Sequence, residues 1–185
     1  MLFRSNSSGQ ITAGVITSTT LNVGTGGTVV TVLNSVGVGS VGIGSTIPTA
    51  TLDVGGHTKF RTYSEAVTSP SISANEVTLD LSVAQSFTVT ASDDINAFVL
   101  TNVPSGSTSF TVKILQDSTG GRSVGIDTFK NSSGTSIPVY WPGGGVLPIV
   151  TTTADRSDIY SFKTFDGDNV TSSGLYGVVG GQNFA

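Results

Sequence analysis

The sequence predicts an all-β protein made of two regions, and its residue composition and apolar spacing are the observations that predict it. Good helix formers are sparse, whereas Val, Ile, Thr and Phe are abundant, and β-branched and aromatic residues favour strands. Apolar residues also recur at every second position in short runs separated by turn residues, the pattern of half-buried strands. We expect an extended, glycine- and threonine-rich β stalk over residues 1–65 and an antiparallel β-sandwich of jelly-roll type over residues 66–185.

In the first region, short phrases rich in glycine and valine repeat. The phrase "SVGVG" at residues 35–39 is followed directly by "SVGIG" at residues 40–44. A two-residue hairpin turn between them would bring their apolar side chains to one face, because type II′ turns take glycine at the first central position. The glycines would share the other face, which another backbone could approach closely. The side chains that we assign to assembly of the stalk are Val36, Val38, Val41, Ile43, Leu52 and Val54.

This first region holds too little bulky side-chain mass to fold unaided. It has almost no aromatic residues after Phe3 and few charges. A lone two-stranded hairpin is unstable in water, and each ordered residue loses about 1–2 kcal/mol of backbone entropy. Burial shared among copies of the chain is the simplest remedy, and small residues suit strands that wrap a narrow axis. We therefore expect a homotrimer with intertwined stalks.

The sequence of the second region predicts a series of short strands. Every second residue is apolar in residues 76–83, 110–114 and 159–163. Clusters of Asp, Asn, Gly and Pro separate such runs about every ten residues, a spacing typical of a sandwich or barrel. Residues 65–75 are expected to form a linker, with Pro70 as a signal of extended chain.

Composition and charge argue against several classes of function. The net charge is −4 and the eight lysines and arginines are scattered, so the basic surface that nucleic acids require is not expected. The sequence has no cysteine, which leaves neither disulfides nor thiolate metal sites and gives no indication of redox compartment. No apolar run approaches the roughly 20 residues of a membrane span. We expect no cofactor.

Few residues suit metal binding or glycoside cleavage. His57 is the single histidine; three copies at a threefold axis could hold a metal, although a turn residue is the simpler interpretation. The acidic clusters at residues 93–94 and 166–169 lack the alternating ligands and distal glutamate of calcium loops, and Asp, Asn and Gly are also turn residues. Glu65 and Glu76 are the only glutamates and lie at the expected junction. We expect no enzymatic activity.

Tyr140 and Trp141, followed by a proline and three glycines, form the most suggestive surface candidate. Aromatic rings combine apolar area with a polar group, so these two residues could stack on the sugar rings of a glycan. The alternative is that Trp141, the only tryptophan, fills the core of the sandwich or an interface between subunits.

Several phrases resemble virion proteins of bacteriophages. The phrase "VGIGSTIPTATLDVGG" at residues 41–56 resembles one common in tail-fibre and related virion proteins. The phrase "GVITSTTLNVGTGGT" at residues 14–28 is similar to threonine-rich repeats in structural proteins of large marine phages, notably those of cyanobacteria. In the second region, "LTNVPSGSTSFTVKILQDSTGGR" and "YWPGGGVLPIVTT" resemble a module found at the ends of such proteins. The resemblance covers most of the chain and implies a trimeric, β-structured virion component.

The expected function is that of a non-enzymatic structural protein of a phage virion, assembled in the host cytoplasm together with other virion proteins. Full tail fibres are usually far longer, so a short fibre or fibre-like appendage of the tail, neck or head fits the length better. Two alternatives stay open. One is a capsid decoration protein that cements capsomers; the other is a receptor-binding tip that recognises a host glycan through Tyr140 and Trp141.

Overall fold

The computed structural model describes residues 41–43 and 50–185. Contacts divide the chain between Arg61 and Thr62 into two compact units, and every sheet lies within one of them. Among the described residues, strands far outnumber helices, and the regular elements of the first unit are strands only. The prediction of an all-β protein is confirmed.

In the first unit, two short strands pair in parallel. β1 (Val41–Ile43) lies beside β2 (Leu52–Val54), so four of the residues assigned to stalk assembly belong to one pair of strands. The other two, Val36 and Val38, lie outside the described residues together with the predicted hairpin turn. The parallel partner was not predicted, because parallel pairing of two strands leaves no turn signal between them in the sequence.

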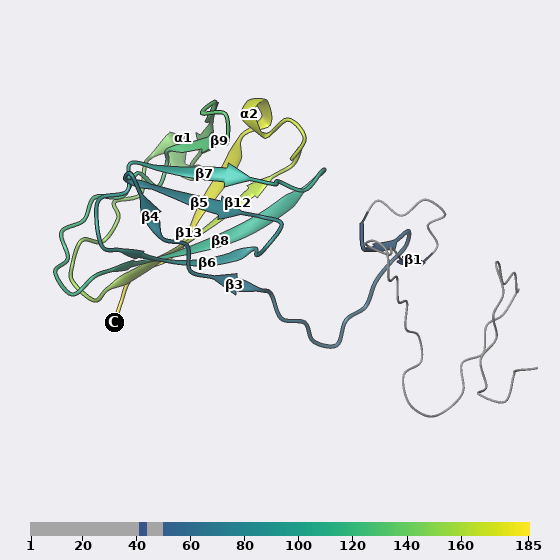
Figure 1. Ribbon diagram of the computed structural model, residues 1–185, viewed down its shortest axis with the longest axis horizontal. Coiled ribbons are helices and arrows are strands. Elements are labelled where there is room, and N and C mark those ends of the chain that lie inside the picture. Colours follow the sequence, from purple (N-terminus) through teal and green to yellow (C-terminus); the bar gives the residue numbers. More distant parts are fainter. Residues whose placement is uncertain (1–40, 44–49) are drawn as a thin grey trace, which may run out of the picture. The chain divides into compact units, whose positions relative to one another are not determined.

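The second unit is a sandwich of two sheets (Figure 1). The five-stranded sheet has the order β10 (Ser136–Ile137), β9 (Phe129–Asn131), β7 (Ala97–Thr101), β5 (Glu76–Asp80) and β4 (Ile72–Ser73). The six-stranded sheet has the order β11 (Val139–Tyr140), β13 (Leu175–Phe184), β12 (Ser157–Thr164), β8 (Thr108–Gln116), β6 (Ser86–Ala91) and β3 (Val67–Thr68). Two short segments of turn or helix lie in the connections: α1 (Pro142–Gly145), whose glycines have left-handed backbone, and α2 (Val170–Ser173).

Successive strands alternate between the two sheets along β5, β6, β7, β8 and β9. Each crossing puts the next strand in the opposite sheet, so β5, β7 and β9 become parallel neighbours, as do β6 and β8. Antiparallel pairs in this unit are β4 with β5, β9 with β10, and β12 with both β8 and β13. The sheets are mixed, so the prediction of an antiparallel sandwich is wrong in its pairing, and the jelly-roll order is not confirmed.

The turn segments explain why the sequence predicts antiparallel strand pairs where the structure has parallel ones. Segments such as residues 92–94 and 117–121 suit a hairpin turn and a connection between sheets equally well. Packed sheets lie about 10 Å apart, a gap that a few extended residues can span. Alternation of apolar side chains is also the same beside a parallel or an antiparallel neighbour, so it carries no information on strand direction.

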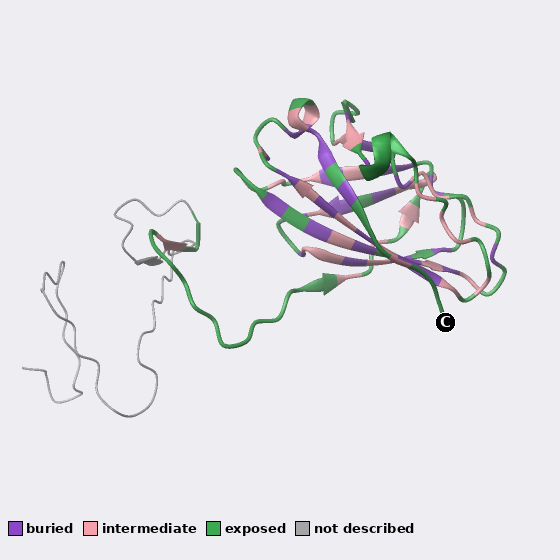
Figure 2. Cartoon of the chain, turned by 180° about the vertical axis from the view of Figure 1, so that it is seen from behind, coloured by how far each residue is buried: buried purple, intermediate pink, exposed green. Residues whose placement is uncertain are grey.

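Apolar residues of both sheets meet in one core, seen as the buried segments of the strands in Figure 2. Phe98 stacks on Phe129 within the five-stranded sheet with ring centroids 5.2 Å apart. Phe110 stacks on Phe162 within the six-stranded sheet at 5.2 Å. The rings of Phe129 and Phe162 are 4.9 Å apart and join the two layers. Such aromatic pairs stabilise a core beyond the area they bury.

The predicted apolar faces are confirmed with one exception. The apolar side chains of residues 110–114, those of Tyr160 and Phe162, and those of Val77 and Leu79 are buried. Val83 was predicted to continue the same face but is 56% exposed. It lies beyond the end of β5, where the chain has already left the sheet.

The predicted linker, residues 65–75, is instead part of the sandwich. β3 pairs in parallel with β6 at one edge of the six-stranded sheet, and β4 pairs with β5 at one edge of the five-stranded sheet. Pro70 lies between these two strands, where its fixed φ and missing N–H suit an extended connection. The proline therefore marks a crossing between sheets rather than a boundary between domains.

Candidate functional site

Three aromatic side chains gather on the outer face of the six-stranded sheet, and we call them the aromatic surface: Tyr140, Phe165 and Tyr176. Tyr140 on β11 is the register partner of Tyr176 on β13, and their ring centroids are 5.2 Å apart. Phe165 directly follows β12 and meets the Tyr176 ring edge-on at 5.5 Å. All three rings remain between 46% and 63% exposed. The surface is thus apolar, preformed and open to a partner.

A depression of about 320 Å³ adjoins the aromatic surface. Its lining comprises Tyr140, Trp141, Pro142, Tyr176, Gly177 and Val178. The three glycines that follow Pro142 all have positive φ, from +71° to +85°, a conformation that side chains other than glycine rarely adopt. The connection therefore turns away without placing side chains over the tyrosine rings.

The electrostatics of the aromatic surface are mild. The Lys163 ammonium lies 5.3 Å from the centroid of the Phe165 ring, a distance suited to a cation–π contact. The lining of the depression contains no carboxylate. Aromatic rings, hydroxyls and a neighbouring cation can contact a partner by stacking and hydrogen bonding.

Trp141 lies in the core and is only 6% exposed. Its ring meets Tyr160 and Phe162 edge-on, with centroids 6.2 and 5.7 Å away. A Cβ at Gly177 would come within 2.6 Å of the indole, so β13 needs glycine where the tryptophan packs. The indole Nε1 is buried without a hydrogen-bond partner among the described residues.

The predicted pair is therefore divided between the two sides of the sheet: Tyr140 faces outward and Trp141 faces the core. This division could have been predicted from the sequence, because consecutive residues of an extended chain point to opposite faces of a sheet. Tyr176 and Phe165 were not predicted as site residues. They join Tyr140 only through the register of β11, β12 and β13, which the sequence does not specify.

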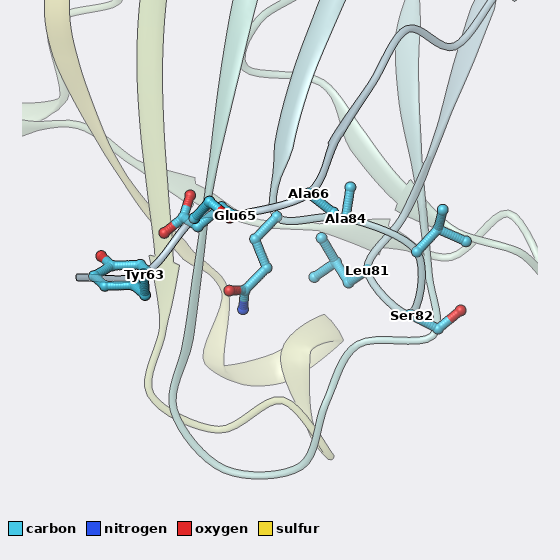
Figure 3. Close-up of a pocket in the computed structure, with 9 residues that line it drawn as sticks. Tyr63, Glu65, Ala66, Leu81, Ser82 and Ala84 are labelled. Atoms are coloured by element: carbon cyan, nitrogen blue, oxygen red, sulfur yellow. The ribbon is translucent and has the colours of Figure 1, made fainter. Parts of the chain in front are cut away.

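A second depression of about 340 Å³ lies where residues 63–66 pass residues 81–85 (Figure 3). Glu65 is the only carboxylate in its lining, and its Oε2 accepts a hydrogen bond of 2.8 Å from the Ser86 hydroxyl. Glu76 pairs with Lys130 across the other sheet at 2.5 Å. The structure does not bring the two glutamates into a common site.

The carboxylates of the two acidic clusters accept hydrogen bonds that hold turns and loops. Asp94 Oδ1 accepts a hydrogen bond of 2.8 Å from the Ser123 backbone N–H, and this bond lowers the pKa of Asp94. The Asp166 carboxylate accepts hydrogen bonds from the backbone and side-chain nitrogens of Asn169. Over residues 41–43 and 50–185, no group of three or more His, Asp or Glu is arranged to hold a metal. His57 is exposed shortly after β2.

Asp158 is a buried carboxylate that sequence reasoning missed. Its Oδ2 accepts hydrogen bonds from the Thr151 backbone N–H at 2.7 Å and the Tyr160 hydroxyl at 2.9 Å. Its Oδ1 accepts one from the Asn183 backbone N–H at 2.8 Å. Burial raises the pKa of Asp158, but these hydrogen bonds outweigh it and the net pKa is lowered. Burial, followed by the bond to Asp158, raises the pKa of Tyr160.

These bonds give Asp158 a structural role. It fastens the segment at Thr151 and the last residues of β13 to β12. The sequence signal was weak, since an aspartate just inside a strand is usually assigned to the solvent face. Only the folded chain shows the segment at Thr151 and the end of β13 donating to the same carboxylate as Tyr160 of β12.

No protein-family model matches the chain, and neither a curated protein nor a solved structure matches it. Among the described residues, no helix has the length and apolar character needed to cross a bilayer.

Proposed function

We propose that the chain is a non-enzymatic structural protein of a bacteriophage virion, a short trimeric fibre or fibre-like appendage of the tail, neck or head. The first unit, which ends at Arg61, forms the stalk, which holds three chains together and attaches them to the particle. The protein assembles with other virion proteins in the host cytoplasm.

The observation that carries this proposal is the lack of burial in the first unit. No side chain between residues 50 and 61 is buried, and Leu52 on β2 is 53% exposed. A two-stranded sheet such as β1–β2 does not supply enough burial to be stable alone in water. Neighbouring chains would supply the missing burial, which favours an intertwined stalk.

The phage assignment is supported by the phrases of the sequence. β1 and β2 both lie in "VGIGSTIPTATLDVGG", the phrase that resembles tail-fibre proteins. Phrases of the second region occur in the order expected of a terminal module. A structural protein is also favoured by the two depressions, because neither is lined by a pair of carboxylates.

Sedimentation equilibrium of the full chain tests the trimer. The expected mass is that of three chains or a multiple of three. Substitution of both Leu52→Asp and Val54→Asp should lower the mass, because carboxylates would replace the apolar side chains shared between chains. Val83→Asp, at an exposed valine of the sandwich, is the control and should keep the parental mass. A monomeric or dimeric parent would contradict the stalk.

Co-purification of the chain with phage particles on a density gradient tests the virion assignment. Copy number per particle then separates an appendage from a decoration protein, because capsid decoration requires many more copies. A chain that never sediments with particles would rule out both.

A glycan-recognising tip is a second candidate, favoured by the aromatic surface. Tyr140 and Tyr176 present half-exposed rings beside an open depression. Tyr140→Ala and Tyr176→Ala should each remove binding to a glycan array while the assembly mass stays unchanged. Tyr63→Ala, at a tyrosine that is 76% exposed elsewhere on the sandwich, is the matched control. Equal binding by all three variants would exclude this surface as a glycan site.

A further inference from the structure

β13 leaves most of one edge without a neighbouring strand. The strand is ten residues long, and β12 pairs with it along one side. On the other side, β11 pairs only with Leu175 and Tyr176. Apart from the ladder with β12, no backbone–backbone hydrogen bond from another described segment reaches residues 177–181. We call residues 177–181 of β13 the open edge.

The strands at the ends of the two sheet orders are short, and β6 and β5 extend past β3 and β4 by only four and three residues. β3, β4, β10 and β11 stand at the ends of the two sheet orders, and each is only two residues long. Very short edge strands limit pairing with other chains, as do edge lysines and prolines. The open edge is longer and reads Gly-Val-Val-Gly-Gly, without lysine or proline. Its pairing with β12 shifts register between Val179 and Gly181, so the irregularity lies near its end and leaves Gly177, Val178 and Val179 in regular register.

The open edge is also apolar on both faces. Val178 is 56% exposed and Val179 is 38% exposed, and consecutive strand residues point to opposite faces. In Figure 2 the half of β13 that leads to the C-terminus is coloured as exposed. A neighbouring strand would therefore find unpaired backbone groups at the edge and an uncovered valine on each face.

The residues of the open edge fit a second copy of the same strand. Residues 170–185 contain no charged side chain, so two copies would meet without like-charge repulsion. In an antiparallel pair related by a two-fold axis near Val178 and Val179, valines of one copy would lie opposite or diagonal to valines of the other on both faces. Such cross-strand apolar pairs stabilise a sheet, and the two-fold arrangement is the commonest one for identical chains.

The aromatic surface extends this contact. β11 ends at Tyr140 where the open edge begins, and Tyr140 lies against Tyr176. An approaching strand would pass beside these exposed rings and bury part of them. The strand ladder would give direction and register, while the rings would add apolar area.

We propose that the open edge of β13 pairs antiparallel with the open edge of a second copy, so that the two six-stranded sheets become one continuous sheet. This contact is independent of the proposed stalk, because it uses only residues of the sandwich. It joins sandwiches in twos whether or not the stalk joins chains in threes.

Cysteine substitution in the full chain tests the pairing directly, because the sequence contains no cysteine of its own. Residues opposite each other in an antiparallel pair lie about 4.5–5.5 Å apart between Cα atoms, within the range of a disulfide. Val178→Cys, Val179→Cys and Gly180→Cys are oxidised separately, and at least one should give a covalent dimer on a non-reducing gel. Val67→Cys, on the opposite edge strand of the same sheet, should give none.

Failure of all three open-edge variants to form a dimer, or equal dimer formation by Val67→Cys, would overturn the proposal. The cysteine substitutions are small, and each variant is first checked for the parental circular dichroism spectrum.

Assembly mass provides the second test. The double variant Val178→Lys and Val179→Lys places a charge on each face of the open edge and should halve the mass measured for the full chain. Val67→Lys should leave it unchanged. If the stalk trimerises, the parent should contain six chains and the double variant three. If the stalk does not trimerise, the parent should contain two chains and the double variant one. An equal mass for the parent and the double variant would overturn the pairing without bearing on the stalk.

Discussion

At the scale of single residues, the least expected feature is the carboxylate of Asp158. The side chain is almost completely buried, yet it accepts backbone hydrogen bonds from Thr151 and Asn183 and a side-chain bond from Tyr160. A buried charge is tolerated only when it is well bonded. Because one of these bonds comes from Asn183, the charge stabilises the position of the last part of β13 against β12.

The lowered pKa of Asp158 predicts how stability depends on pH. The folded pKa lies below the unfolded value of about 3.9, so the stabilisation is complete above that value and is lost as the pH falls through the folded pKa. Asp158→Asn should lower the free energy of unfolding at pH 7 by about 1–3 kcal/mol, because an amide nitrogen would face backbone donors. Urea denaturation at several pH values measures both effects.

Two outcomes check this prediction. The difference in stability between the parent and Asp158→Asn should shrink as the pH approaches 3. Asp168→Asn, at an exposed aspartate for which the described part of the chain shows no hydrogen bond, should match the parent at every pH. A difference between Asp158→Asn and the parent that stays constant with pH would show that the carboxylate is not the stabilising species.

Tyr140 and Trp141 show at the same scale what sequence reasoning can and cannot assign. Their residue types indicated either a surface site or a core position. Tyr140 lies at the surface, and Trp141 lies in the core. The exposed partners of Tyr140 come from β13 and the end of β12. No local pattern links residues 140, 165 and 176, because strand register depends on the packing of the whole sheet.

At the scale of strands, apolar alternation located the core faces but not the ends of the strands. Val77 and Leu79 are fully buried in β5, while Val83 lies beyond it and is exposed. The pattern continued through a turn because apolar residues also occur in connections. The hydrogen-bond ladder, which the sequence does not display, decides where a strand ends.

The variants Leu79→Ala and Val83→Ala compare the stability cost of truncating a buried and an exposed side chain. Removal of a buried leucine side chain should cost about 2–5 kcal/mol of unfolding free energy, through lost burial and the cavity left behind. Val83→Ala should change stability by less than about 0.5 kcal/mol, since exposed positions contribute little. Equilibrium unfolding in urea measures both. A large loss for Val83→Ala would mean that an interface in the assembled protein covers this valine.

At the scale of the whole molecule, the division between Arg61 and Thr62 determines where the chain should be most easily cut. Lys59 and Arg61 are both exposed and lie outside the strands. By contrast, Lys113 and Lys163 lie within β8 and β12, where the backbone is held in the ladder. Proteases select segments that open locally at low free energy.

Limited trypsin digestion should therefore cut first after Lys59 or Arg61 and leave a resistant fragment that contains residues 62–185. Mass spectrometry of the early products identifies the sites. A variant with both Lys59→Gln and Arg61→Gln should lose these cuts and keep the remaining digestion pattern. Early cleavage after Lys113 or Lys163 would show that the sandwich opens more readily than the connection.

The sequence alone determined the class of secondary structure and the side chains that form the core of the sandwich. Both follow from local physics, since branched and aromatic residues favour strands and alternation reflects one buried face. Tertiary structure decided the direction of pairing, the inclusion of β3 and β4 in the sheets, and the meeting of Tyr140, Phe165 and Tyr176. Those features depend on which backbone lies beside which, and backbone hydrogen bonds are the same for every residue type except proline.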